Sequence, residues 1–138
     1  MVDKKQNKLT ISGKRKTAIA KATICEGKGE ILINKVPYEN FDFFKKLIVN
    51  EPVEITKKVL GGFNFDIRVN VRGGGNESQI AASRLAIARA LVEFTKSDEL
   101  KKAFSDYDKN LLVADTRRKE PYKPGDSKAR RKRQSSFR

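Results

Sequence analysis

The chain has 138 residues, no histidine, a single cysteine and a formal net charge of +14. One cysteine excludes an internal disulfide framework, and the lack of histidine removes the commonest general base and metal ligand. We therefore predict one domain with an extension, no enzymatic activity, no metal or other cofactor, and a polyanionic partner.

The first third of the chain predicts strands. Leu9 and Ile11 alternate with polar neighbours, after a polar stretch, residues 1–8, that we expect to be disordered. Residues 17–25 are rich in small and β-branched side chains, and a Glu-Gly-Lys-Gly turn separates them from a second run, Glu-Ile-Leu-Ile, over residues 30–33. We interpret these two runs as a hairpin.

The middle of the chain predicts a helix and the clearest strand. Apolar residues at helical spacing, among them Phe44 and Leu47, indicate a short amphipathic helix over about residues 39–49. For residues 51–60 the pattern does not decide between a helix and a loop. Residues 63–71 alternate strictly between apolar and polar side chains and so predict a strand with one buried face.

The remainder of the globular part predicts two helices. Asn76 or Ser78 caps a long helix whose wide apolar face suits packing on a sheet, and Ser97 caps a last one. Residues 111–113 are left open between a final strand and a docking segment. Strands with helices on one face give an α+β, two-layer fold, with the globular domain over residues 9–115.

A cationic motif, Lys14-Arg15-Lys16, lies at a predicted strand entrance, directly before the run that begins at residue 17. Three adjacent cations can pair with phosphates, and Gly13 lets the backbone approach them closely. A solvated charge cluster explains the same pattern, and both interpretations remain open.

A second motif is the run of three glycines that follows Arg72, between a strand and a helix: Gly73, Gly74 and Gly75. Backbone N–H groups at a helix start form an anion site, whereas the alternative is a turn that only fits the geometry. No Gly-Lys-Ser/Thr follows, so this is no Walker loop. On the helix we expect Arg84 to reach a polyanion and Arg89 to lie along the surface.

The tail, residues 116–138, is the strongest signal. It holds ten Lys and Arg against two acidic residues, so +8 of the +14 lies in one sixth of the chain. Such a segment has no core of its own and is expected to become ordered only against something large and negative. Nucleic acid fits best, while a localisation signal or solubility tail is the alternative. Fully stretched, the tail reaches on the order of 70 Å.

Four motifs in this order resemble the family of small ribosomal subunit protein nine, in particular its archaeal and eukaryotic branch. They are SGKRKTAIAKA at 12–22, VNVRGGG at 69–75 followed by Gln79, LLVADTRRKEP at 111–121 and KARRKRQSSFR at 128–138. The resemblance implies a fold like domain two of ribosomal protein S-five. That fold has a mostly antiparallel sheet, two helices on one face and a left-handed crossover.

The resemblance also implies partners and sites. The body binds rRNA in the head of the small subunit, and the tail contacts P-site tRNA. The expected rRNA ligands are Lys14, Arg15, Lys16, Arg72, Gly73, Gly74, Gly75, Gln79, Arg84, Arg117, Arg118, Lys119, Lys123 and Lys128. The expected tRNA ligands are Arg130, Arg131, Arg133, Phe137 and Arg138.

Other partners expected are neighbouring proteins of the head, with no membrane association and no homo-oligomer. The chain has neither an N-terminal signal peptide nor a run of about 20 apolar residues, so we expect it in the cytoplasm, on the ribosome. A free, basic DNA-compacting or regulatory protein is the alternative from another functional class.

Overall fold

The structure, a computed structural model, describes residues 7–122 and residue 129. Its elements in chain order are β1 (Leu9–Arg15), β2 (Ala18–Glu26), β3 (Ile31–Ile33), β4 (Val36–Pro37), the 3-10 turn η1 (Tyr38–Asn40), α1 (Phe43–Leu60), β5 (Phe65–Arg72), α2 (Asn76–Thr95), α3 (Asp98–Tyr107) and the 3-10 turn η2 (Lys109–Leu111).

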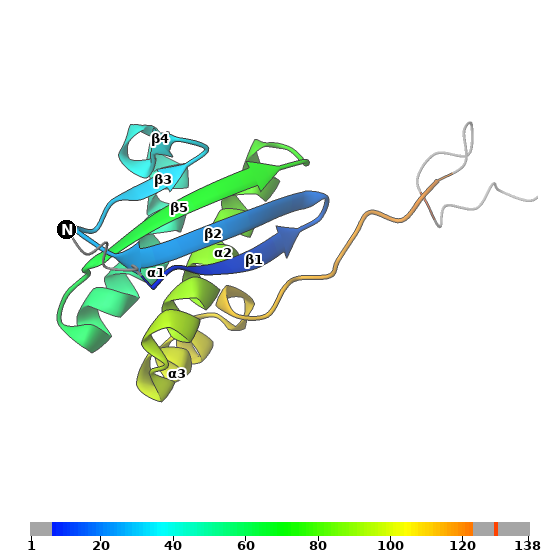
Figure 1. The fold of residues 1–138 in the computed structure, drawn as a ribbon. Coiled ribbons are helices and arrows are strands. Elements are labelled where there is room, and N and C mark those ends of the chain that lie inside the picture. The colour runs from blue at the N-terminus through cyan, green and yellow to red at the C-terminus, as the bar shows by residue number, and fades with distance from the viewer. Residues whose placement is uncertain (1–6, 123–128, 130–138) are drawn as a thin grey trace, which may run out of the picture.

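The strands form one five-stranded sheet in the order β1-β2-β5-β3-β4. Three of its strand pairs are antiparallel, and β3 with β5 is parallel. Figure 1 shows α1 and α2 behind this sheet, with α3 beyond the edge strand β1. The predicted α+β class and mostly antiparallel sheet are confirmed. The face of the sheet turned away from the helices has no covering layer in the described part of the chain.

Small side chains bring α2 unusually close to β1 and β2. The inward residues of β2 begin with three fully buried alanines, Ala18, Ala20 and Ala22. On β1 the corresponding place belongs to Gly13, where an added Cβ would lie 2.6 Å from the Ala82 carbonyl oxygen. The backbone of β1 therefore lies almost against α2. Gly13 serves this packing, and the prediction that it lets a phosphate approach is wrong.

Residues 17–33 do not form the predicted hairpin, because β5 lies between β2 and β3. The chain does reverse after β2, but the loop crosses the end of β5. There the Asp66 carboxylate accepts hydrogen bonds from the N–H groups of Lys28, Gly29 and Glu30 at 2.8–3.1 Å. These bonds, that of Glu30 foremost, hold the pKa of Asp66 below its usual value. A turn motif marks the reversal but not the strand that pairs next.

The predicted short helix over 39–49 is in fact η1 followed by the 18-residue helix α1. Pro52 lies inside this helix, and Gly61, with φ of 75°, ends it. Phe44 and Leu47 are 76% and 47% exposed, so their assignment to the buried face is wrong. The buried face begins one turn later, where the helix meets α2 and α3.

The C-terminal part of the body agrees better with expectation. Ser97 caps α3, and its side chain accepts the Leu100 N–H at 3.3 Å. The N-cap of α2 is Gly75, one residue before the predicted Asn76. Residues 111–113 dock on the body instead of adding a strand, since η2 places Leu111 fully buried in the core.

Gly13→Ala should lower the free energy of unfolding by at least about 2 kcal/mol, because the new methyl group meets backbone atoms of α2 that cannot move aside. Urea denaturation of the two proteins measures the difference. Gly62→Ala is the matched control, because nothing lies within 4 Å of its added Cβ. Equal stability of Gly13→Ala and the wild type would contradict the close packing of β1 on α2.

Candidate nucleic-acid interface

Three segments that are distant in sequence converge at one end of the sheet (Figure 1). They are the β1–β2 turn, the glycine loop between β5 and α2, and the chain that leaves η2. A Cβ on Gly73 would lie 2.7 Å from the carbonyl oxygen of Thr17, so the loop lies against the turn. Arg15 on β1 pairs with Asp115 at 2.9 Å, which joins the turn to the outgoing chain. The fold therefore brings together the basic motifs identified in the sequence.

The glycine loop serves the fold at two of its positions. Gly73 and Gly74 have φ of 78° and 69°, and an added Cβ on either would crowd Thr17 or Ala18. The Gln79 side chain donates to the Gly73 carbonyl oxygen at 3.2 Å and closes the loop onto α2. Gly75 differs, because nothing lies within 4 Å of its added Cβ. Its exposed backbone, at the N-terminus of α2, is where an anion can approach.

The three cations of the β1–β2 turn differ in what they face. Lys14 and Lys16 are exposed, and Lys16 adopts the left-handed backbone conformation with φ of 52°. Arg15 is about three-quarters buried and held by Asp115. Arg72, at the end of β5, is exposed beside them. The exposed three can therefore meet a polyanion directly, while Arg15 fixes the outgoing chain.

Asp115 organises the point where the chain leaves the body. Its carboxylate accepts from the backbone N–H and from Nε and Nη2 of Arg117 at 2.8–3.1 Å, and it pairs with Arg15. These partners, the Arg117 side chain foremost, hold the pKa of Asp115 far below its usual range. Asp115 therefore stays charged throughout the physiological pH range.

The next residues carry the positive charge outward. Arg118 and Lys119 are exposed, and the Lys119 ammonium lies 4.9 Å from the centre of the Tyr122 ring. The remaining predicted ligands lie outside the described residues: Lys123, Lys128, Arg130, Arg131, Arg133, Phe137 and Arg138.

Arg84 has partners inside the fold. Its guanidinium pairs with Glu51 on α1 and with Asp108 after α3, the latter at 3.0–3.1 Å from both terminal nitrogens. The side chain is only 18% exposed. This arginine therefore ties three helices together, and contact with RNA stays a prediction that its surroundings do not favour.

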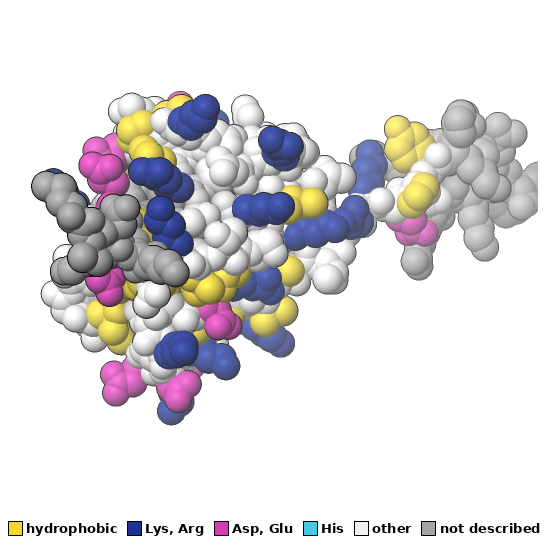
Figure 2. All heavy atoms as spheres, in the orientation of Figure 1, with side chains coloured by type: hydrophobic (Ala, Val, Ile, Leu, Met, Phe, Trp, Pro, Cys, Tyr) yellow, Lys and Arg dark blue, Asp and Glu magenta, His cyan; other side chains and the backbone are white. Residues whose placement is uncertain are grey.

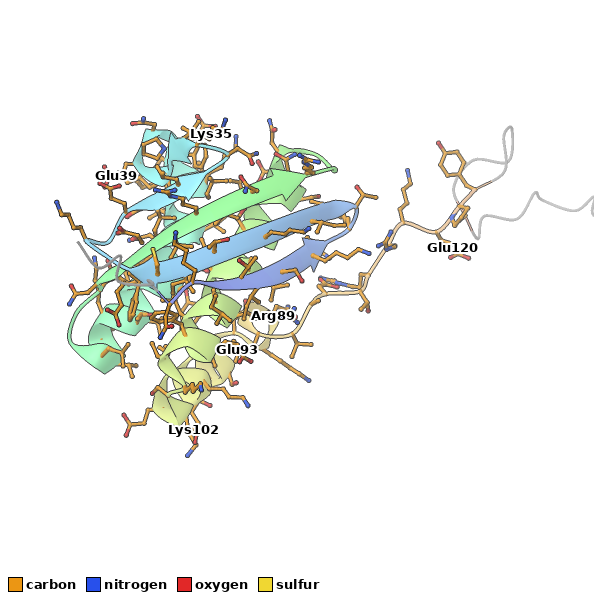
Figure 3. The ribbon with its side chains drawn as sticks, viewed as in Figure 1. Lys35, Glu39, Arg89, Glu93, Lys102 and Glu120 are labelled. Carbon is orange, nitrogen blue, oxygen red and sulfur yellow. The ribbon has the colours of Figure 1, made fainter. Side chains whose placement is uncertain are left out.

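Arg89 behaves as the sequence suggested and stays within the body. Its Nε donates to the Leu112 carbonyl oxygen at 2.8 Å, and Nη1 donates to that of Ser12 at 3.2 Å. It thereby fastens the segment before the tail to β1. Figure 3 shows it below the sheet, beside Glu93.

The sequence motifs missed basic residues on the open face of the sheet. Lys21 on β2, Arg68 on β5 and Lys35 in the β3–β4 turn are all exposed. Figure 2 shows Lys and Arg side chains spread over this face, while most Asp and Glu lie toward its left and lower margins. The alternation of residues 63–71 was enough to place Arg68 on the polar face. Placing Lys21 and Lys35 on the same face required the strand order, which the sequence pattern did not give.

The chain is similar to known ribosomal proteins over nearly its whole length. The family model described as ribosomal protein S9/S16 matches residues 13–138. A small ribosomal subunit protein uS9 from Methanococcus vannielii is 47% identical over 129 residues, which cover 91% of this chain and 95% of the relative. Proteins of the same name from Desulfurococcus amylolyticus and Thermoplasma volcanium are 48% and 44% identical and cover 92% of this chain, with 90% and 96% of their own lengths matched.

Arg84→Gln should lower the free energy of unfolding by about 2 kcal/mol, because two half-buried carboxylates lose their cation. The affinity for a labelled RNA hairpin should stay within about twofold of that of the wild type.

Arg72→Gln is the matched variant, because it removes an exposed arginine with no ion pair among the described residues. It should weaken hairpin binding and change stability by less than about 0.5 kcal/mol. Urea titration and fluorescence anisotropy measure the two quantities. A loss of RNA affinity in Arg84→Gln equal to that in Arg72→Gln would assign Arg84 to the interface instead.

Proposed function

The chain belongs to the ribosomal protein S9/S16 family, and we propose that it is a structural component of the small ribosomal subunit that acts in translation. The three relatives named above come from archaea, in agreement with the predicted archaeal and eukaryotic branch. The protein binds rRNA in the head of the subunit with its body, and it contacts P-site tRNA with its C-terminal tail.

One observation carries the rRNA part of this proposal: three basic segments meet at one end of the sheet. Phosphates attract closely spaced exposed cations, and such contacts position a protein without reading sequence. Lys14, Lys16, Arg72 and the Gly75 backbone are the proposed direct ligands of the body. Arg15, Gln79 and the first two glycines of the loop have partners in the fold and hold these ligands in place.

The outgoing chain continues the interface. Arg117, Arg118 and Lys119 begin it, and the proposed division sets a globular domain at 9–115 before a tail at 116–138. Lys123 and Lys128 extend the rRNA contact, while the tRNA contact falls to Arg130, Arg131, Arg133, Phe137 and Arg138. Support comes from the charge density of the tail and from the resemblance of its last eleven residues to family tails.

Further parts of the proposal concern the setting. The protein is not an enzyme, contacts neighbouring head proteins, does not form homo-oligomers and works in the cytoplasm. In the described ranges no helix is long and apolar enough to cross a membrane, and no three metal-ligating side chains are grouped. The left-handed crossover that the resemblance implies would be the connection through α1 between the parallel strands β3 and β5.

Sedimentation tests the proposed function. A tagged copy of the full chain, expressed in cells that normally make it, should migrate with the small subunit in a sucrose gradient and stay there after a wash in ~0.5 M salt. Buried contacts with rRNA and neighbouring proteins resist such screening better than contacts on free nucleic acid do. Release into the soluble pool, or migration with DNA, would favour the basic DNA-compacting protein.

Deletion of Arg138 should leave assembly of the subunit intact and speed the release of P-site tRNA about fivefold, as expected for one lost charge-assisted contact of ~1 kcal/mol. Release of labelled tRNA from purified subunits measures the effect. Arg138→Lys keeps the charge but not the bidentate geometry, so its rate of tRNA release should lie between those of the wild type and the deletion. An unchanged release rate in the deletion would remove Arg138 from the tRNA contact.

A further inference from the structure

A shallow hollow of about 670 Å³ lies on the open face of the sheet, away from the helices. Its lining comes from β2, β5 and the β3–β4 turn: Ile19, Lys21, Asn34, Lys35, Asn70, Val71 and Arg72. Three of these residues are cationic and none is acidic. The volume lies within the range of 300–1,000 Å³ that is usual for small-ligand sites.

The floor of the hollow is set by strand register. Ile19 pairs with Arg72 and Lys21 pairs with Asn70 across β2 and β5. Directly opposed side chains lie about 5 Å apart, and the next pair on the same face follows about 7 Å along the strand. An apolar group, an amide and two cations therefore share a patch about the size of one nucleobase.

The wall of the hollow is fixed to β5. The Asn34 side chain accepts the Val71 N–H at 2.8 Å and donates to the Val71 carbonyl oxygen at 3.3 Å. Asn34 thereby extends the pairing of β3 with β5 and holds the turn upright. Lys35, next in the turn with φ of 68°, adds its ammonium to the rim (Figure 3). The hollow is therefore formed before any ligand arrives.

The side chains that line the hollow offer three kinds of contact to a ligand: charge, hydrogen bonding and apolar surface. Lys21, Lys35 and Arg72 have no ion pair, and the Asn70 amide has no hydrogen-bond partner, among the residues that the structure describes. Ile19 is 44% exposed and gives the floor of the hollow an apolar surface. Phosphates satisfy the cations but leave Ile19 and Asn70 unexplained.

We propose that this hollow seats one unpaired nucleotide of RNA. The base packs on Ile19 and meets the Asn70 amide with a polar edge, while the flanking phosphates pair with Lys21, Lys35 and Arg72. Stacked bases inside a helix cannot enter such a site, whereas a bulged or looped-out base can. The inference rests on the proposed function, because it assumes that the partner is RNA. It adds a base-binding site on the sheet to an interface otherwise made of phosphate contacts.

The test compares two labelled RNA hairpins that differ only by a one-nucleotide bulge, each bulge base being tried in turn. The full chain should bind at least one bulged hairpin about fivefold or more tighter than the paired hairpin, by fluorescence anisotropy at fixed salt. The tail binds both RNAs through their backbones, so its contribution cancels in the ratio. Ile19→Ser and Asn70→Ala should each bring this ratio close to one and leave binding of the paired hairpin unchanged.

Lys102→Gln, on α3 far from the hollow, is the control for charge and should keep the ratio (Figure 3). If Ile19→Ser or Asn70→Ala loses stability in a thermal melt, Lys35→Gln replaces it as the test variant, because Lys35 lies in a turn and not in a strand. A wild-type ratio near one for all four bases would overturn the proposal, and so would a ratio that survives Ile19→Ser, Asn70→Ala and Lys35→Gln. Failure of the proposed function looks different, because the chain would then not sediment with the subunit, whatever the ratio of the two hairpin affinities.

Discussion

The close packing of α2 on β1 and β2 is the constraint on which the rest of the structure depends. Alanines on β2 and Gly13 on β1 let the helix approach almost to backbone contact, and this contact buries the inner face of these two strands. The opposite face is left bare at the same time. Because α2 begins directly after the glycine loop, the packing also fixes that loop against the β1–β2 turn. One helix placement thus produces both the core and the end of the sheet where the basic segments meet.

The net charge of the chain overestimates the number of cations available to a polyanion, because several arginines bind partners inside the fold. Arg84 ties three helices through two carboxylates, Arg89 holds two backbone carbonyl groups, and Arg15 holds Asp115. Lys14 and Lys21 are different in kind, because each is exposed on a strand and has no ion pair among the described residues. Arginine suits the first task because its planar group can bridge several acceptors at once.

How much the sequence could predict follows from whether a feature is local. Alternation over residues 63–71 located β5, and Ser97 located the start of α3, because both patterns act within a few residues. Strand order is not local, so the turn after β2 suggested a hairpin although β5 lies between β2 and β3. Phe44 and Leu47 had the spacing of a buried face, but the partners that decide burial come from α2 and α3. The sequence motifs included the exposed cations Lys14, Lys16 and Arg72 but not those of the open face, because the place of Lys21 and Lys35 depends on strand order.

The ion pair between Arg15 and Asp115 has a kinetic meaning beyond the fold, because it fixes the point from which the tail starts. Twenty-three residues follow Asp115, so Arg138 is confined to within ~75 Å of that point. One molecule in a sphere of that radius has a local concentration of about 1 mM. A contact with a dissociation constant near this value would be half occupied once the body is bound. Under the proposed function, the end of the tail can then exchange between successive tRNA molecules while the body stays bound to the subunit.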